Sequence, residues 1–285
     1  MQNFDVVIVG AGISGIGAAC HLQTQCPNKT FTILESRKQS GGTWDLFQYP
    51  GIRSDSDMHT LGFNFKPWTA AKSIADGPSI KSYLTETIAE HGLDQHIQHE
   101  HKVLSADWSS DDAAWTVTTE HRGETRQFCC NFLMMCSGYY NYDTPYTPDF
   151  KGQNDFRGSV IHPQHWPKDL DYKGKNVVVI GSGATAMTLV PAMADEAARV
   201  TLLQRSPTYV VARPDQDKIA NTLRKLLPNS VAYALTRFKN TQLQHFMYQR
   251  MRKEPQKMKK GLIALVREAL GSDYDVDKHF TPRYN

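Results

Sequence analysis

Residues 5–15, DVVIVGAGISG, give the first and clearest indication of the fold. Its β-branched run predicts a short buried strand of a parallel sheet, and the glycines that follow end the strand and open a helix. In a G-x-G-x-x-G turn, Gly10 permits the tight turn, Gly12 lets the backbone approach a pyrophosphate, and Gly15 lets the helix pack on the strand. The pattern therefore predicts a dinucleotide-binding turn.

The end of the next strand makes this prediction more specific. Phe31–Leu34 is a second predicted strand, and Glu35 follows it about 20 residues past the glycines, where an acid accepts the hydroxyls of an adenosine ribose. The helix N-terminus offers free N–H groups to the phosphates. A glycine-rich turn that binds nothing would leave Glu35 unexplained.

A second copy of the unit lies further along the chain. Asn176–Ile180, NVVVI, precedes Gly181–Ala186, GSGATA, in which alanine is an accepted variant of the last glycine. The following strand, Val200–Leu203, ends in Gln204–Ser206, QRS, instead of an acid. A surface arginine is the alternative interpretation, but the register of Arg205 after the turn favours a guanidinium that pairs with a 2′-phosphate.

These strand ends predict two different nucleotides. Glu35 suits a free ribose and Arg205 suits NADPH, so FAD at the first turn and NADPH at the second form the natural pair. A flavin supplies oxygen chemistry that side chains cannot.

Composition excludes several classes of protein. The 285 residues, 40% hydrophobic and 21% charged, suit two globular domains, and a net charge of +3 gives no nucleic-acid signature. The first residues, MQNFDVVIVG, lack a signal peptide, and no apolar run reaches the roughly 18 residues of a membrane span. Five cysteines without a CxxC pair predict free thiols in the cytoplasm and argue against disulfide reductases. No cluster has metal-ligand spacing, so no metal is expected.

The fold class expected is α/β, with two Rossmann-like domains, a small antiparallel β insertion and a helical insertion. The loop 41–68 is long and polar, and apolar spacing predicts a helix over 79–91. Further strands are expected at 102–108, 115–119 and 126–131, all antiparallel, and at 132–136, which is expected to be buried.

The expected domains are residues 1–140 for FAD, 141–175 as a linker, 176–214 as the start of the NADPH domain, and 215–285 as its helical insertion. Residues 215–270 are rich in Lys and Arg. This stretch could be a membrane-surface helix, but a solvated, Lys-rich face over the NADPH domain is the simpler interpretation.

The linker holds the most specific motif. Phe156–Pro167 fits F-x-G-x-x-x-H-x-x-x-W-P and resembles the fingerprint of the Baeyer–Villiger flavin monooxygenase family. Segments 41–45, 49–57 and 136–141 resemble mycobacterial members of that family and their bacterial relatives. The motif positions are Phe156, Gly158, His162 and Trp166.

The resemblance implies a set of cofactor-binding residues. Those for FAD are Gly10, Gly12, Ser14, Gly15, Glu35, Gly42, Thr43, Trp44, Asp45, Leu46 and Val103. The segment between flavin and nicotinamide is Arg53, Ser54 and Asp55. Those for NADPH are Ser182, Gly183, Ala184, Thr185, Ala186, Met187, Thr188, Arg205 and Ser206.

The resemblance also implies a reaction. NADPH reduces FAD, O2 forms a C4a-peroxyflavin, and a ketone becomes an ester or lactone; sulfides and thioamides are further oxygen acceptors. Asp55 and Arg53 are the expected catalytic residues, although without the resemblance Asp55 would be a turn-forming Asp. His162 and Trp166 are expected to couple domain movement to cofactor binding rather than to catalyse.

Two other functions stay open, namely a flavin-containing N- or S-monooxygenase and a truncated, non-catalytic nucleotide-binding module. Trp166-Pro167 and Asp55 favour the Baeyer–Villiger branch. Members of the family are longer, so we expect this chain to be an N-terminal part. The active-site arginine and most of the substrate pocket would then follow Asn285, and these residues alone would bind FAD weakly without coupled oxygenation.

Overall fold

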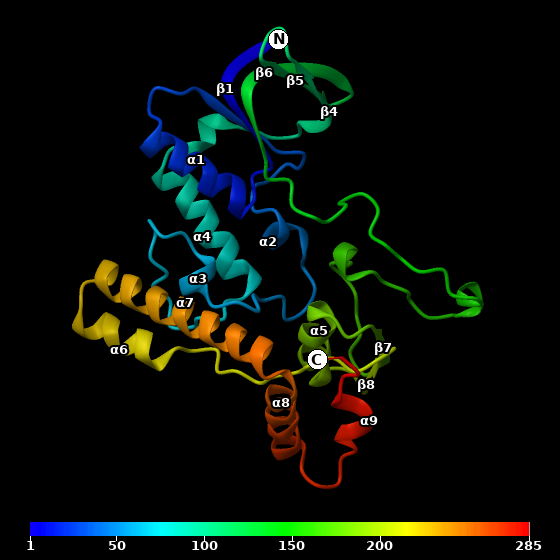
Figure 1. The fold of residues 1–285 in the computed structure, drawn as a ribbon. Coiled ribbons are helices and arrows are strands. Elements are labelled where there is room, and N and C mark those ends of the chain that lie inside the picture. The colour runs from blue at the N-terminus through cyan, green and yellow to red at the C-terminus, as the bar shows by residue number, and fades with distance from the viewer. Residues whose placement is uncertain (285) are drawn as a thin grey trace. The chain divides into compact units, whose positions relative to one another are not determined.

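The computed structural model describes residues 1–284 and forms two compact units (Figure 1). Unit 1 comprises Met1–Gln48 and Gly77–Trp166, and unit 2 comprises Tyr49–Asp76 and the chain from Pro167 onward. The boundary after Trp166 lies inside the fingerprint. Tyr49–Asp76 groups with unit 2, whereas the expected boundaries assigned it to residues 1–140.

Unit 1 is built on one six-stranded sheet of order β3-β2-β1-β6-β5-β4. Four strands run parallel, and β5 and β4 continue the sheet antiparallel from β6. The strands are β1 (Gln2–Val9), β2 (Phe31–Leu34), β3 (Ile97–Gln98), β4 (Lys102–Ser109), β5 (Ala114–His121) and β6 (Glu124–Met135). The helices are α1 (Ile13–Gln25), α2 (Thr43–Leu46) and α4 (Gly77–Glu90), with short 3₁₀ turns η1 (Leu93–His96), η2 (Gln153–Asp155) and η3 (Pro163–His165). The mixed α/β fold with a largely parallel sheet confirms the expected class.

Strand β6 differs from the expected pattern. Residues 126–131 and 132–136 were expected to form two strands, but β6 is continuous from Glu124 to Met135. It pairs in parallel with β1 along one edge and antiparallel with β5 along the other. The expected antiparallel insertion is therefore part of the main sheet. Its last stretch is also not buried, because Phe132 and Met135 are 60% and 61% exposed.

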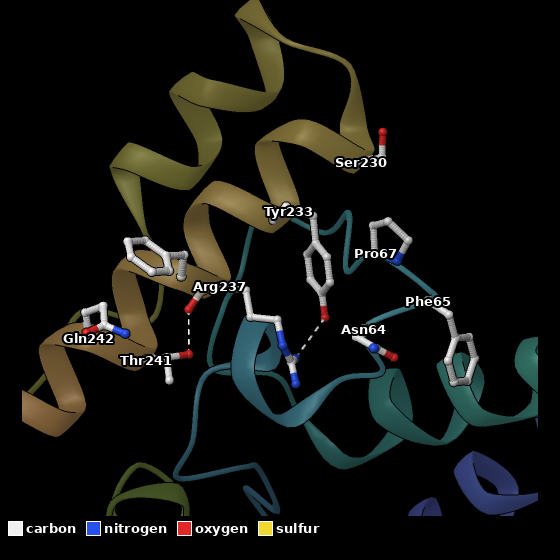
Figure 2. A pocket seen from close by; sticks show the side chains of 10 residues that line it. Asn64, Phe65, Pro67, Ser230, Tyr233, Arg237, Thr241 and Gln242 are labelled. Carbon is white, nitrogen blue, oxygen red and sulfur yellow. Dashed lines mark hydrogen bonds between the residues drawn. The ribbon is translucent and has the colours of Figure 1, made fainter. Parts of the chain in front are cut away.

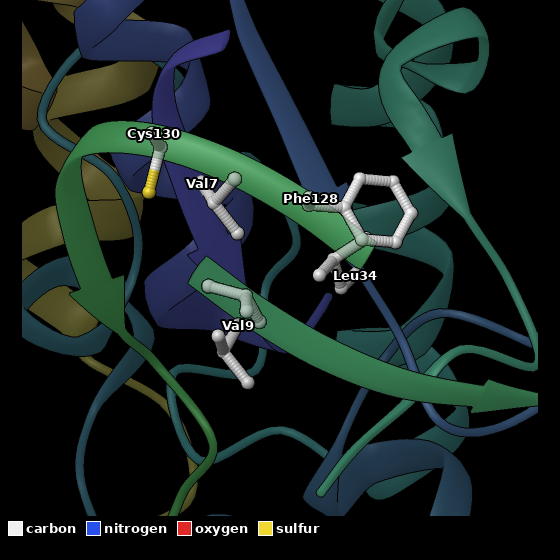
Figure 3. Close-up of a cluster of buried hydrophobic side chains, with 6 residues drawn as sticks. Val7, Val9, Leu34, Phe128 and Cys130 are labelled. Atoms are coloured by element: carbon white, nitrogen blue, oxygen red, sulfur yellow. The ribbon is translucent and has the colours of Figure 1, made fainter. Parts of the chain in front are cut away.

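The core of unit 1 spans both halves of this sheet. Its buried cluster comprises Val7, Val9, Leu34, Val117, Phe128 and Cys130 (Figure 3). Val117 on β5 and Val7 on β1 are both fully buried, so the antiparallel strands share one core with the parallel ones. Burial of each such side chain contributes about 1.5–3 kcal/mol.

Unit 2 carries a two-stranded parallel sheet and most of the helices. Its elements are β7 (Asn176–Ile180), β8 (Arg199–Leu203), α3 (Met58–Leu61), α5 (Ala184–Ala194), α6 (Lys218–Leu226), α7 (Asn229–Lys253), α8 (Pro255–Leu270) and α9 (Val276–Phe280).

Helix α7 holds the segment Tyr49–Asp76 in unit 2. Arg237 on α7 donates through Nη1 to the carbonyl oxygens of His59 and Gly62 at 2.9 and 2.8 Å. The Tyr233 hydroxyl donates to the Phe63 carbonyl at 2.9 Å. The arginine thus satisfies carbonyls at the C-terminal end of α3, which would otherwise lack partners.

Candidate functional site

The first glycine turn has the geometry that its sequence predicts. Gly10 has φ +105°, and a methyl group there would lie 2.5 Å from the carbonyl oxygen of Cys136. A methyl group on Gly15 would lie 1.9 Å from the carbonyl oxygen of Gly10. Helix α1 therefore sits closer to the end of β1 than any side chain at Gly15 would allow. No side chain caps α1 at Gly12, so its first N–H groups remain available to a ligand.

Glu35 is held at the end of β2 beside this turn. It is only 4% exposed, and its Oε2 accepts the N–H of Ala11 at 2.8 Å. Its Oε1 accepts the N–H of Arg37 at 2.9 Å. These bonds fix both carboxylate oxygens and leave further lone pairs, which fits the predicted role as acceptor of ribose hydroxyls.

The turn Gly41–Leu46 closes over the first glycine turn. Gly42 has φ +55°, and a methyl group on it would lie 3.0 Å from the Cα of Gly12. The close approach of the two backbones therefore favours glycine at Gly42, where a side chain would be both strained and crowded. The absence of side chains here leaves backbone N–H groups as the lining, which fits a phosphate-bearing group.

Charge pairing fixes the same turn. Asp45 is 6% exposed and pairs with Arg37 Nη2 at 2.6 Å and with the Lys81 ammonium. Arg37 also donates through Nη1 to the Gly42 carbonyl at 3.3 Å. Asp45 was among the predicted FAD residues, whereas Arg37 and Lys81 were not. The basic residue two positions after Glu35 was the available signal for Arg37, whereas Lys81 lies on the distant α4.

The other predicted FAD residues occupy different settings in unit 1. Ser14 is exposed in the first turn of α1. Thr43, Trp44 and Leu46 are half-buried in α2. Val103 lies on β4 and packs against the buried core cluster, so a ligand contact from it would use its backbone.

The second glycine turn repeats the first in its backbone. The Gly181 N–H donates to the Leu203 carbonyl at 2.8 Å, as the Gly10 N–H does to Leu34 at 2.8 Å. Gly181 has φ +117°, and Gly183 caps α5 without a side-chain hydrogen bond. A methyl group on Gly183 would meet nothing within 4 Å. The uncapped helix and open backbone fit a pyrophosphate.

The predicted NADPH residues surround this turn. Ser182, Thr185 and Met187 are half-buried, Ala184 is exposed, and Ala186 and Thr188 are buried. Arg205 is exposed just after β8, and Ser206 is half-buried. Gln204 between strand and arginine donates to the His279 carbonyl at 2.7 Å, which leaves the Arg205 guanidinium at the free end of the strand.

Segment Tyr49–Asp55 lies against α5 within unit 2. The Tyr49 side chain is 6% exposed and hydrogen-bonds to Thr185, and burial raises its pKa. Gly51 has φ +76°, and a methyl group on it would lie 2.6 Å from the Cβ of Ala192. Tyr49 and Gly51 fall within the segment 49–57 that carries the family resemblance, but neither was predicted to position the site.

The three predicted residues Arg53, Ser54 and Asp55 follow directly after these contacts in the chain. Ser54 is buried, and it bonds Ala75 through its N–H at 2.9 Å and its Oγ at 3.3 Å, so its side chain serves the loop. Arg53 forms a backbone bridge with Asp76. Asp55 is exposed and adds to the field at Tyr49. The segment therefore meets α5 through Tyr49 and Gly51, and Arg53 and Asp55 follow as exposed residues.

The fingerprint ends unit 1. His162 caps η3 by accepting the Gln164 N–H on Nδ1 at 3.2 Å, and burial lowers its pKa. Gln164, which is 4% exposed, donates to the Asn141 carbonyl at 2.6 Å. Phe156 is 62% exposed, and its ring occupies the space beside Gly158. The motif therefore orders the linker through local contacts.

Residues 1–284 contain no group of three His, Cys, Asp or Glu side chains placed to hold a metal ion. Over the same range, no helix combines the length and the apolar character needed to cross a membrane.

Comparison with known proteins gives the family. Residues 73–268 match the model of the flavin-binding monooxygenase-like family, and residues 8–76 match an NAD(P)-binding Rossmann-like domain. The FAD-containing monooxygenase EthA of Mycobacterium tuberculosis is 56% identical over 285 residues, which cover 100% of this chain and 58% of that protein. EthA of Mycolicibacterium smegmatis matches with the same identity and coverage. The chain thus spans 58% of the length of these relatives.

Solved structures of monooxygenases also match this chain. An oxidised steroid monooxygenase bound to NADP superposes with a TM-score of 0.69 at 30% identity, covering 82% of this chain and 43% of that one. Cyclohexanone monooxygenase bound to ε-caprolactone gives 0.71 at 26% identity, with 82% and 45% covered, and its cyclohexanone-bound form gives 0.68 at 27% identity, with 79% and 43% covered. The resemblance expected from the fingerprint is confirmed, and the chain belongs to the flavin-binding monooxygenase-like family.

Proposed function

We propose that this chain is the nucleotide-binding portion of an FAD- and NADPH-dependent monooxygenase that inserts one oxygen atom of O2 into a ketone. One observation carries the proposal. The two glycine turns have the same backbone geometry, but different groups follow the strands beside them. A buried carboxylate, Glu35, follows β2, whereas an exposed guanidinium, Arg205, lies just after β8. The first suits a ribose with free hydroxyls and the second a 2′-phosphate.

In unit 1, FAD would be held by backbone and by Glu35. The first turn of α1 donates N–H groups to the pyrophosphate, and Glu35 accepts the adenosine hydroxyls. Arg37 and Lys81 fix Asp45 and with it the turn that faces Gly12. Preorganisation of this kind lowers the entropy lost on binding.

In unit 2, NADPH would be held by the second turn and Arg205. Thr185 follows the glycines on α5, and its contact with Tyr49 joins the nucleotide turn to the segment of Arg53 and Asp55. We propose that Arg53 and Asp55 line the reaction site, with the Asp55 carboxylate orienting the guanidinium of Arg53. An oriented cation there would stabilise negative charge during oxygen transfer.

Bound and reduced flavin supplies the oxygen chemistry that the side chains lack. The overall reaction consumes a ketone, O2, NADPH and a proton, and yields an ester or lactone, NADP⁺ and water. The structural relatives bound to cyclohexanone and to ε-caprolactone support a ketone-to-lactone reaction. Sulfides and thioamides are further proposed acceptors.

We also propose a cytoplasmic protein. All five cysteines are free thiols, and burial raises the pKa of Cys20 to about 11. Such a thiol stays protonated and unreactive at neutral pH.

Reduction followed by oxygenation tests the function. The complete monooxygenase of which we propose this chain to be a portion is loaded with FAD and mixed with NADPH without oxygen, and the visible flavin absorbance is followed. Isotope-labelled O2 is then added with cyclohexanone or with an alkyl aryl sulfide. We expect NADPH to bleach the flavin faster than NADH. Label in a lactone supports the Baeyer–Villiger reaction, and label in a sulfoxide alone favours an S-monooxygenase. Failure of NADPH to reduce bound FAD would overturn the proposal.

A further inference from the structure

The outer face of helix α7 carries an apolar stripe. Val231, Leu235, Phe238 and Phe246 follow the spacing of one helix face and are 45%, 47%, 67% and 57% exposed. A solvated, Lys-rich face was the expectation for this region. The stripe instead presents aliphatic and aromatic side chains to solvent over the first five turns of the helix.

The stripe is not the face that packs inside unit 2. Ala232, Tyr233 and Thr236 are buried on the opposite side, where α7 meets α3 and α6. Helix α7 therefore has two apolar sides, of which one already has its partner. Exposed apolar side chains that gather on one face of a soluble protein mark a binding surface more often than singly scattered ones do.

Positive charge is concentrated around the stripe. Residues 218–260 contain 11 Lys and Arg and one acid, Glu254, a net charge of +10. Because the whole chain has 32 basic and 29 acidic residues, the remainder has 21 and 28, a net charge of −7. Helix α7 itself has five basic residues and no acid. The charge of the chain is thus separated between this region and the rest.

Several of these cations are free to bind. Lys253 lies seven residues beyond Phe246 and continues the spacing of the stripe. Within residues 1–284, the exposed side chains of Lys218, Lys225, Lys253 and Lys260 make no ion pair with an acid. Arg252 lies over the Tyr248 ring, with its Cζ 5.9 Å from the ring centroid.

A groove of about 460 Å³ opens beside the stripe and shares Phe238 and Gln242 with this face of α7 (Figure 2). Phe65, Pro67 and Tyr233 form apolar walls, and the Arg237 guanidinium lies between Tyr233 and Asn64. The groove offers apolar space next to a cation, which suits an acyl chain with an anionic head.

We propose that this surface binds the face of an anionic phospholipid bilayer, with the outer side of α7 lying at the membrane interface. An interfacial helix places an apolar side at the acyl boundary and Lys and Arg toward the phosphates. The outer side of α7 offers Phe238 and Phe246 for the first role, and the helix carries five basic residues and no acid for the second. The phosphate layer takes the unpaired lysines, and the acyl boundary takes Phe238 and Phe246. A protein interface of the same size would instead deplete lysine from its centre.

Co-sedimentation with vesicles tests the proposal without cofactors or activity. The probes are vesicles of phosphatidylcholine alone and vesicles mixed with phosphatidylglycerol. We expect binding to the mixed vesicles only, and we expect it to weaken as salt screens the charges. Each cation near an anionic surface contributes about fivefold in affinity, so R252E/K253E should bind at least about 25-fold more weakly.

The apolar stripe is tested separately by F238S/F246S, which should weaken binding to mixed vesicles about tenfold or more. Matched controls are K168E/K173E for charge and L104S for an exposed apolar residue, and both should bind like the parent chain. Thermal unfolding of every variant checks that the fold is retained.

Equal binding to neutral vesicles, or unchanged binding by both test variants, would overturn the proposal. So would a dimer in analytical ultracentrifugation that F238S/F246S dissociates while vesicle binding persists, because the stripe would then be an interface between copies of the chain.

Discussion

The two glycine turns have the same backbone geometry but differ in the sheets and side chains that surround them. Their leading glycines donate the same 2.8 Å hydrogen bond to the next strand, and Gly12 and Gly183 begin their helices with nearly equal dihedral angles. The first turn lies in a six-stranded sheet and the second in a two-stranded one. Turn geometry therefore follows from the local glycine pattern, whereas we propose that the strand ends select the nucleotide.

A second difference lies at the last residue of the two motifs, which is Gly15 in the first and Ala186 in the second. At Gly15 a methyl group would meet the Gly10 carbonyl, while Ala186 already carries one and remains buried. The first turn is also held by an ion-paired carboxylate, Asp45. The first site is thus more tightly constrained than the second, and the following predictions test that contrast.

The largest effect is expected at the close packing of α1. Gly15→Ala forces a methyl group into the Gly10 carbonyl, so unit 1 should lose roughly 3 kcal/mol of unfolding free energy or fail to fold. Ala186→Gly should cost only about 1 kcal/mol in unit 2. Urea unfolding measures both, and equal losses would remove the distinction between the turns.

The ion pairs at Asp45 should come next. Arg37→Met removes one partner of a carboxylate that is 6% exposed, and Lys81 retains the other. We expect a loss of about 2 kcal/mol in urea unfolding and weaker FAD binding. The double variant R37M/D45N should recover part of the loss, because it removes the stranded charge. A double variant as unstable as the sum of both single changes would argue against pairing.

A smaller effect is expected where the segment of Asp55 meets α5. Tyr49→Phe removes the hydrogen bond to Thr185 and should cost about 1 kcal/mol. NADPH affinity should fall severalfold while FAD affinity stays unchanged, as measured by calorimetric titration. If FAD affinity changed and NADPH affinity did not, the assignment of the Tyr49–Thr185 contact to the NADPH site would be contradicted.

The smallest effect concerns pH. His59 is 2% exposed, its Nδ1 has no partner, and burial lowers its pKa. Above pH of about 6.5 the His59 ring is neutral in both the folded and the unfolded states, so its protonation does not change the free energy of unfolding. As the pH falls below that value, the unfolded chain takes up the proton first, so stability declines. His59→Gln should flatten this decline in thermal unfolding between about pH 6.5 and 5, and an unchanged slope would contradict the assignment.

Local features of the sequence predicted the backbone geometry of the first glycine turn. Gly10, Gly15 and Glu35 lie within one strand–turn–helix–strand unit, so their spacing was enough to place them beside one another. The continuity of β6 was missed because it depends on simultaneous pairing with β1 and β5. The place of Tyr49–Asp76 was missed because its partners are distant in sequence; Arg237 bonds Gly62 from 175 residues further along. The apolar outer face of α7 was not predicted, because the region was interpreted from its many Lys and Arg residues and not from the spacing of its apolar ones.

We propose that Glu35 selects FAD and that Arg205 selects NADPH. Calorimetric titration of two variants with both nucleotides measures these two preferences separately. Glu35→Gln should weaken FAD binding at least about tenfold and leave NADPH binding within about twofold. Arg205→Glu should do the reverse, and it should weaken NADPH more than NADH because only NADPH has the 2′-phosphate. If both variants weakened both nucleotides equally, or if Arg205→Glu weakened FAD alone, the assignment of the two turns would be contradicted.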